Sequence, residues 1–452
     1  MADLNDIKYY PDKFYIRLNG CDLEHLFEST SDFTLTLDQA VFIHEYYHYL
    51  TNISTFQGVR SFQAAFCDLF RLVTILTHRR GLDAFPVSQN ILADCAYEVG
   101  YWNILNEVFR EDNVSQALAL ETQNSPSGQF KIVNIEKEYG EEYTVKRNGI
   151  EYKGRREYVR LEIEGLPQTE HFRLPIGAID EFLSASIDEF LFEKGLSKYT
   201  DIFKHRPFYP YGAYDKIIQY FNLRLESRDK ILVAYYALHA FNPAVTLYEI
   251  LEKVAEDGQN QLESNPCECL EKHFHMFSTY DRLINEFDLF IDEAKQARRQ
   301  LSAQILAYFQ DRFITANALI KKDPLYFVRP FLVDNLDDIR GRQEFWIDMM
   351  RIKSSFPEPL FITGKEFKTT RPYEYGADLT ILALAIYEII ESLESSKVAR
   401  RLEHYKNKYD YPDGCNSFED VSTFTPPPLF AYWHKALNEL GLYQFYLNNL
   451  KP

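Results

Sequence analysis

The chain carries the segment TLDQAVFIHEYYHYLTNI at residues 36–53, and several local signals in it predict a helix. Thr36 and Gln39 occupy the two key positions of a capping box, in which the N-cap side chain and the third helical side chain bind backbone N–H groups reciprocally. Asp38 adds a negative charge to the first turn, where the helix dipole favours it. Uncharged residues flank the central polar residues. We therefore predict a buried helix that directs a few polar groups toward an internal site.

Two His of this helix stand four residues apart, and a helix brings such residues to one face. The imidazoles of His44 and His48 then point the same way and can bind one metal ion. Glu45 lies one step round the helix, close enough to hold a water molecule on that metal. These are the central parts of a metal-dependent hydrolase. The alternative is a buried helix in which hydrogen bonds alone satisfy both His.

At residues 41–50, VFIHEYYHYL, the chain resembles the zincin superfamily of zinc metallopeptidases, whose extended motif has uncharged residues around its two His. The resemblance implies a zincin-like helical core, Zn²⁺ as cofactor, and a protein or peptide substrate. It also implies His44 and His48 as zinc ligands and Glu45 as the catalytic general base. The metzincin branch is excluded, because Thr51 and Ser54 stand where that branch has Gly and His.

Proteins of the gluzincin-like branch take their third zinc ligand from a Glu on a later helix, and a helix beginning near Leu174 suits this role. Its small residues permit close packing against another helix. Glu181 is the predicted third ligand. Asp188 shares its face two turns later and would orient a ligand His through the other ring nitrogen. Asp180, Asp188 and Glu189 remain open as alternative ligands.

Other residues are weaker candidates for metal ligands. Asp68, Asp94 and Glu98 lie in apolar helical settings and could serve in an unusual arrangement. A second cluster gathers four soft ligands within nine residues, namely Cys267, Cys269, His273 and His275. Because its spacing matches no familiar structural zinc site, buried thiols and surface His are the favoured interpretation there.

Gluzincin-like proteins often use a Tyr or His that follows the third ligand to stabilise the tetrahedral oxyanion. The candidates in this chain are Tyr209, Tyr211, Tyr214 and His239. The sequence does not choose among them, because the chain holds 32 Tyr.

Composition limits the class of protein. The 452 residues include 49 basic and 67 acidic side chains, a net charge of −18, which argues against general binding to nucleic acid or to anionic membranes. Six Cys without a C-x-x-C motif favour a reduced compartment. The first residues do not form a secretory signal, and the longest apolar run is too short to cross a bilayer. We expect a compact cytoplasmic protein.

Patterning along the chain predicts an α+β fold that is predominantly helical, with a small antiparallel β-sheet insert. Residues 1–115 would form an N-terminal helical part after a short irregular start, and residues 116–175 the sheet. Residues 176–280 would form a helical part with the third ligand, and residues 281–452 a helical C-terminal region that selects substrates or binds a regulatory protein.

Several elements of that plan have their own signals. A break at residues 56–58 precedes predicted helices over 59–77 and 88–109. Strands are predicted over 130–135, 143–146, 150–152, 158–163 and 171–174, with a hairpin at Asn148-Gly149. Apolar residues at three- to four-residue spacing, with one longer step, predict one long helix over 281–319.

The leading functional hypothesis is a zinc-dependent peptidase that is narrow in specificity or regulated. The alternative is a non-catalytic helical interaction protein with a structural or vestigial metal site. A di-iron carboxylate oxidase is also conceivable, because Glu45 and His48 form an E-x-x-H motif. That motif occurs twice in such proteins and has no second copy here, which disfavours the di-iron hypothesis.

Overall fold

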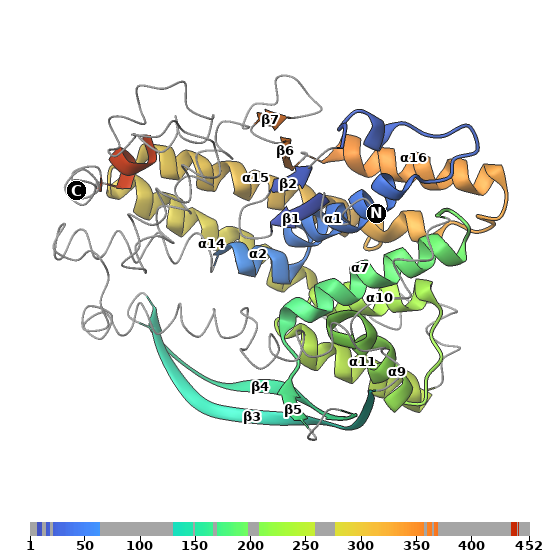
Figure 1. Ribbon diagram of the computed structural model, residues 1–452. Helices are drawn as coiled ribbons and strands as arrows, with labels where there is room; N and C mark the ends of the chain where they lie inside the picture. The colour runs from blue at the N-terminus through green and yellow to red at the C-terminus, as the bar shows by residue number, and fades with distance from the viewer. Residues whose placement is uncertain are drawn as a thin grey trace, which may run out of the picture.

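The computed structural model describes residues 7–10, 15–18, 21–63, 130–147, 150–165, 170–197, 208–257, 276–356, 359–363, 366–368, 435–440 and 442. Within these ranges helices predominate, and two small sheets accompany them (Figure 1). The predicted class, α+β and mainly helical, is confirmed in this form. The predicted helix over 88–109, and the part of the 59–77 helix beyond residue 63, lie outside the described residues.

Helix α1 (Leu37–Ser54) is the predicted metal-binding helix. Its capping box is present: the backbone N–H of Gln39 donates to Thr36 Oγ1 over 3.3 Å, and the backbone N–H of Thr36 donates to Gln39 Oε1 over 2.9 Å. Most side chains of α1 are buried. The helix therefore runs through the interior, as the uncharged flanks of the motif predict.

Helix α2 (Phe56–Phe62) begins directly after α1, so the break predicted at residues 56–58 lies at Thr55 instead. Thr55 Oγ1 accepts a hydrogen bond from the backbone N–H of Gly58 over 3.1 Å and caps α2. A Cβ on Gly58 would lie 2.2 Å from the carbonyl oxygen of Asn52. Gly58 therefore allows the two helices to approach closely and does not end a helix.

Helix α7 (Ile176–Glu193) lies against α1 on one side and α10 (Ser227–Leu238) on another (Figure 1). Small buried residues on α7, such as Ala178 and Ser184, allow this close packing. The acidic residues of α7 are thereby brought next to the His residues of α1, although more than a hundred residues of chain separate them.

The remaining helical elements connect and cover this pair. They are η2 (His25–Phe27), η6 (Phe208–Gly212), α9 (Ala213–Tyr220), α11 (Pro243–Asp257), α14 (Met276–Gln296), α15 (Gln300–Lys322), η7 (Tyr326–Leu332) and α16 (Ile339–Ser355). Buried hydrophobic side chains from all the main elements form one continuous core. Among the described residues, no helix is both long and apolar enough to cross a membrane.

The single long helix predicted over 281–319 is wrong, because α14 and α15 form a helical hairpin there. The chain turns at Arg298, whose φ of 60° lies in the left-handed region. The backbone N–H of Arg299 donates to the carbonyl of Ala294 over 2.8 Å, as in a Schellman motif. Gly usually fills the left-handed position of this motif, so an Arg there gave no signal in the sequence.

The predicted antiparallel sheet is present in the part of the chain that follows α1 and precedes α7. It consists of β3 (Lys131–Arg147), β4 (Ile150–Glu164) and β5 (Glu170–Arg173), in that order. The predicted hairpin is confirmed, because Arg147 pairs with Ile150. The strands predicted over 130–135 and 143–146 are parts of β3, which continues through a register shift between Tyr139 and Glu142.

A second sheet was not predicted. It joins β1 (Ile7–Tyr10), β2 (Tyr15–Leu18), β6 (Leu360–Thr363) and β7 (Glu366–Lys368) in that order, with β2 and β6 parallel and the other pairs antiparallel. The chain start, expected to be irregular, is thus paired with strands from the region expected to be helical. Strand β1 is an edge strand and lies on α1.

Candidate metal centre

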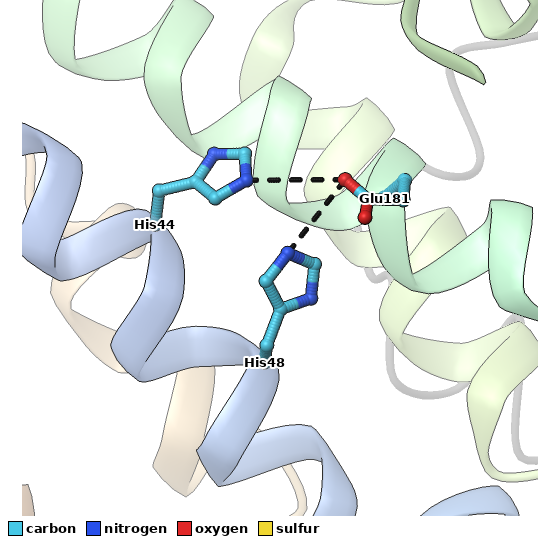
Figure 2. Close-up of side chains that lie close together, drawn as sticks. All are labelled: His44, His48 and Glu181. Atoms are coloured by element: carbon cyan, nitrogen blue, oxygen red, sulfur yellow. Dashed lines mark ion pairs between the residues drawn. The ribbon is translucent and has the colours of Figure 1, made fainter. Parts of the chain in front are cut away.

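Two helices supply the three predicted ligands, as Figure 2 shows. His44 and His48 project from α1 toward Glu181 on α7, and one ligand atom of each lies within 4.8 Å of the others. Glu181 Oε2 is 3.9 Å from His44 Nε2 and 3.7 Å from His48 Nε2. Among the residues that the structure describes, this is the only group of three or more His, Cys, Asp or Glu side chains with such geometry.

The donor set suits a zinc ion. Ligand atoms about 2.0–2.2 Å from zinc in a tetrahedral arrangement lie roughly 3.3–3.5 Å apart, a few tenths of an ångström less than the distances to Glu181 Oε2. That oxygen is buried and has no hydrogen-bond partner. A buried carboxylate oxygen that accepts no hydrogen bond is costly, and a cation between it and the two imidazoles would remove the cost. The three residues therefore fit a metal ion, although their geometry does not identify which one.

Two carboxylates from α7 fix the orientation of the imidazoles. His44 Nδ1 lies 2.8 Å from Asp188 Oδ2, and His48 Nδ1 lies 2.7 Å from Asp180 Oδ2. A carboxylate can only accept from a ring N–H, so the Nδ1 atoms carry the protons. The Nε2 atoms, which face Glu181, are then available to a metal, as in many carboxylate–histidine–metal arrangements.

The predicted contact of Asp188 with a ligand His is present, whereas the role of Asp180 was not foreseen. Asp180 was weighed only as an alternative ligand, yet it contacts the far nitrogen of His48. Its other oxygen accepts from the hydroxyl of Thr51 over 2.6 Å. Thr51 follows His48 by three residues on α1, so its hydroxyl is the sequence feature that could have pointed to an acidic neighbour beside His48.

The pKa values of both imidazoles are raised in this setting. Burial lowers the pKa of His48, but the charges of Asp180 and Glu181 more than reverse this and raise it to about 10. Burial likewise lowers the pKa of His44, and Asp188 raises it above its ordinary value. Without metal the ring of His48 is therefore protonated near neutral pH, and the ring of His44 binds a proton more readily than a free imidazole. A metal ion that binds at the Nε2 atoms must displace these protons.

Glu45 is held by the edge strand of the second sheet. Its Oε2 accepts a hydrogen bond from the backbone N–H of Tyr9 over 2.7 Å. Tyr9 is itself anchored on α1, because its hydroxyl accepts from Asn52 Nδ2 over 3.0 Å. The charge of Glu45 also contributes to the raised pKa values of His44 and His48, which places the carboxylate in the electrostatic field of the cluster.

Glu189, the remaining alternative ligand, binds Lys230 and neither His. Its two oxygens accept from Lys230 Nζ over 2.9 and 2.8 Å. Lys230 lies on α10 and also donates to Asp215 over 2.7 Å. Glu189 thus fastens α7 to α10 and lies outside the His cluster.

The four candidates for oxyanion stabilisation differ in burial and in the residues that they contact. The ring of Tyr211 lies 6.4 Å from the ring of His44, in an edge-on arrangement. Tyr214 is buried and its hydroxyl donates to the carbonyl of Lys230. Tyr209 is buried, and so is His239, whose ring contacts Tyr235 at 4.7 Å. The ring of Tyr211 thus contacts a candidate metal ligand.

The other candidate ligands cannot be placed. Asp68, Asp94 and Glu98 lie outside the described residues, as does the cluster of Cys267, Cys269, His273 and His275.

Comparisons of the chain with profiles of known protein families, with curated proteins and with solved structures found no match. The His44, His48 and Glu181 cluster is therefore the observation on which a function for this chain rests.

Proposed function

We propose that the protein is a zinc-dependent peptidase in which His44, His48 and Glu181 hold the metal. The observation that carries the proposal is the convergence of both Nε2 atoms on one buried carboxylate oxygen that accepts no hydrogen bond from the described residues. The outer carboxylates support it, because they set the ring tautomer that metal binding requires.

When bound, zinc supplies Lewis-acid activation of a water molecule and of the scissile carbonyl group. Glu45 accepts a proton from the attacking water and delivers it to the leaving amine. The backbone N–H of Tyr9 restrains the carboxylate of Glu45 during these transfers, because it occupies one lone pair of Oε2. Tyr211 is our choice for the group that donates a hydrogen bond to the developing oxyanion.

A catalytic role is favoured over a structural zinc site by the number and kind of ligands. Structural zinc sites are usually closed by four protein ligands and are rich in Cys, whereas catalytic sites use three and leave a position for water. Two His and one Glu converge among the described residues, and the charge of Glu45 acts on both His. The competing function is a non-catalytic interaction protein whose metal only joins α1 to α7.

Metal content and new peptide termini distinguish these functions. We expect about one zinc per chain in protein purified without chelator, and cleavage of peptides from a proteome-derived library, detected as new termini by mass spectrometry. Glu45→Gln keeps an oxygen that can accept from Tyr9 but cannot take up a proton near neutral pH. It should retain zinc and lose activity by a factor of about 100 to 10,000.

Glu189→Gln is the matched control, because it makes the same chemical change on α7 away from the cluster. It should retain both zinc and activity. Equal cleavage by wild-type protein and Glu45→Gln would contradict the mechanism. One zinc per chain without any cleavage would favour the interaction protein. We further propose that the peptidase is selective or regulated, so that few library peptides are cut.

A further inference from the structure

A second unusual group lies on α15 and includes none of the predicted metal ligands. Arg312 is only 2% exposed, although its guanidinium carries a permanent positive charge. Its Nη1 donates to the hydroxyl of Tyr49 over 3.4 Å, and its Nη2 donates to the hydroxyl of Tyr308. The ring of Tyr308 also stacks on the guanidinium, with 4.3 Å between Cζ and the ring centroid.

These contacts do not satisfy the guanidinium. Its Nε is buried and has no hydrogen-bond acceptor. No carboxylate of the described residues forms an ion pair with Arg312. Lys230 shows the contrast within the same protein, because this buried cation is neutralised by both Glu189 and Asp215. Buried charges in folded proteins are normally paired, and an anion bound beside Arg312 would supply the partner that the described residues do not.

The chemistry of the site defines that partner. A guanidinium presents a planar fork of N–H groups that matches the two oxygens of a carboxylate or phosphate group. The hydroxyl of Tyr308 accepts from Arg312 and keeps its own hydrogen as a donor. Because Arg312 is almost fully buried while Tyr308 is only partly buried, a small group approaching past Tyr308 fits better than a large surface.

We propose that Arg312, Tyr49 and Tyr308 form a binding site for a small oxyanion, either a carboxylate or a phosphate group. This site goes beyond the proposed peptidase function and does not depend on it. It also joins α15 to α1, because Tyr49 belongs to the metal-binding helix. Binding of the oxyanion therefore stabilises the contact between these two helices.

The test measures the thermal unfolding midpoint of the zinc-loaded protein in inorganic phosphate, acetate or chloride at constant ionic strength. An anion that binds through the metal affects the wild-type protein and Arg312→Met alike, so the difference between them reports the proposed site. We expect phosphate or acetate to raise the midpoint of the wild-type protein with a saturable dependence on concentration. In Arg312→Met the apparent affinity for the oxyanion should fall at least tenfold. Without oxyanion Arg312→Met should unfold at the same or a higher temperature, because a buried unpaired charge has been removed.

Arg340→Met is the matched control, because the Arg340 side chain is 85% exposed and pairs with Glu344 on the protein surface. It should respond to oxyanions as the wild-type protein does. A response to acetate identifies a carboxylate ligand, and a response to phosphate alone identifies a phosphate group. Identical responses of all three proteins to every anion would overturn the site.

Should Arg312→Met fail to fold, Tyr308→Phe decides the question. This variant keeps the ring that covers the guanidinium and removes one hydroxyl, so we expect it to fold and to bind oxyanion more weakly than the wild-type protein. Undiminished oxyanion affinity in Tyr308→Phe would contradict the proposed site.

Discussion

Replacing Asp188 by Asn tests whether the outer carboxylates tune the metal centre. Asp188 Oδ2 lies 2.8 Å from His44 Nδ1, and both side chains are nearly buried, with exposed fractions of 10% and 13%. Asn keeps the size of the side chain and can still accept one hydrogen bond. It removes the negative charge that raises the pKa of His44, and it permits the amide to flip its NH₂ group toward the ring.

The expected effect follows from this loss. Outer-sphere substitutions of this kind reduce metal affinity about 10- to 100-fold, which corresponds to about 1.4 to 2.7 kcal/mol of binding free energy. The measurement is competition for zinc against a chelator of known affinity at fixed pH. The fold should be unchanged, because the contacts of Asp188 with the core are preserved in shape.

Glu189→Gln is the control for this experiment as well. Glu189 is the next residue on the same helix, but its carboxylate binds Lys230 and not a His. Its substitution should lower stability without changing zinc affinity. Equal zinc affinities for the wild-type protein and Asp188→Asn would refute the reasoning. Equal losses in both variants would show that the effect comes from α7 as a whole.

Three further predictions concern protons and the backbone. Because the pKa values of His44 and His48 are raised, zinc must displace about two protons below pH 6.5, and zinc affinity should rise about 100-fold from pH 5.5 to 6.5 in chelator competition; an affinity independent of pH would contradict this. Burial lowers the pKa of His239 to about 3. Between pH 6.5 and 3 this side chain is therefore protonated in the unfolded chain but neutral in the folded protein. His239 therefore costs stability progressively as pH falls through that window, up to roughly 5 kcal/mol, and His239→Gln should flatten the pH dependence seen in urea unfolding. Arg298→Gly should raise the free energy of unfolding by about 1 kcal/mol, because Arg298 has a left-handed backbone conformation; a loss of stability would show that the Arg side chain contributes more than the backbone strain costs.

Local signals explain what the sequence could predict. The capping box of Thr36 and Gln39 and the spacing of His44 and His48 depend on contacts within one helix, and both are present in the structure. The Asn148-Gly149 hairpin is local in the same sense. Glu181 could be chosen because a later helix with small residues and spaced acids suits close packing on α1.

Non-local features escaped the sequence analysis for physical reasons. Strands β2 and β6 are four residues each and pair across more than three hundred residues, so neither carries a periodic pattern long enough to detect. The turn between α14 and α15 uses Arg298 where Gly is usual. The contact of Asp180 with His48 depends on how α7 packs against α1, and the spacing of side chains along α7 does not determine that packing.

The metal centre also has a consequence for how the chain reaches its native state. His48 and Asp180 are 132 positions apart, and the third ligand is the next residue. A metal ion held between α1 and α7 would act as a reversible cross-link that closes a very long loop, and the stability it adds would grow with the concentration of free metal. Chelation should loosen the packing of α7 on α1 while leaving each helix formed. Hydrogen exchange at the amides of α7 would then report how tightly the ion is held, even before any substrate is known.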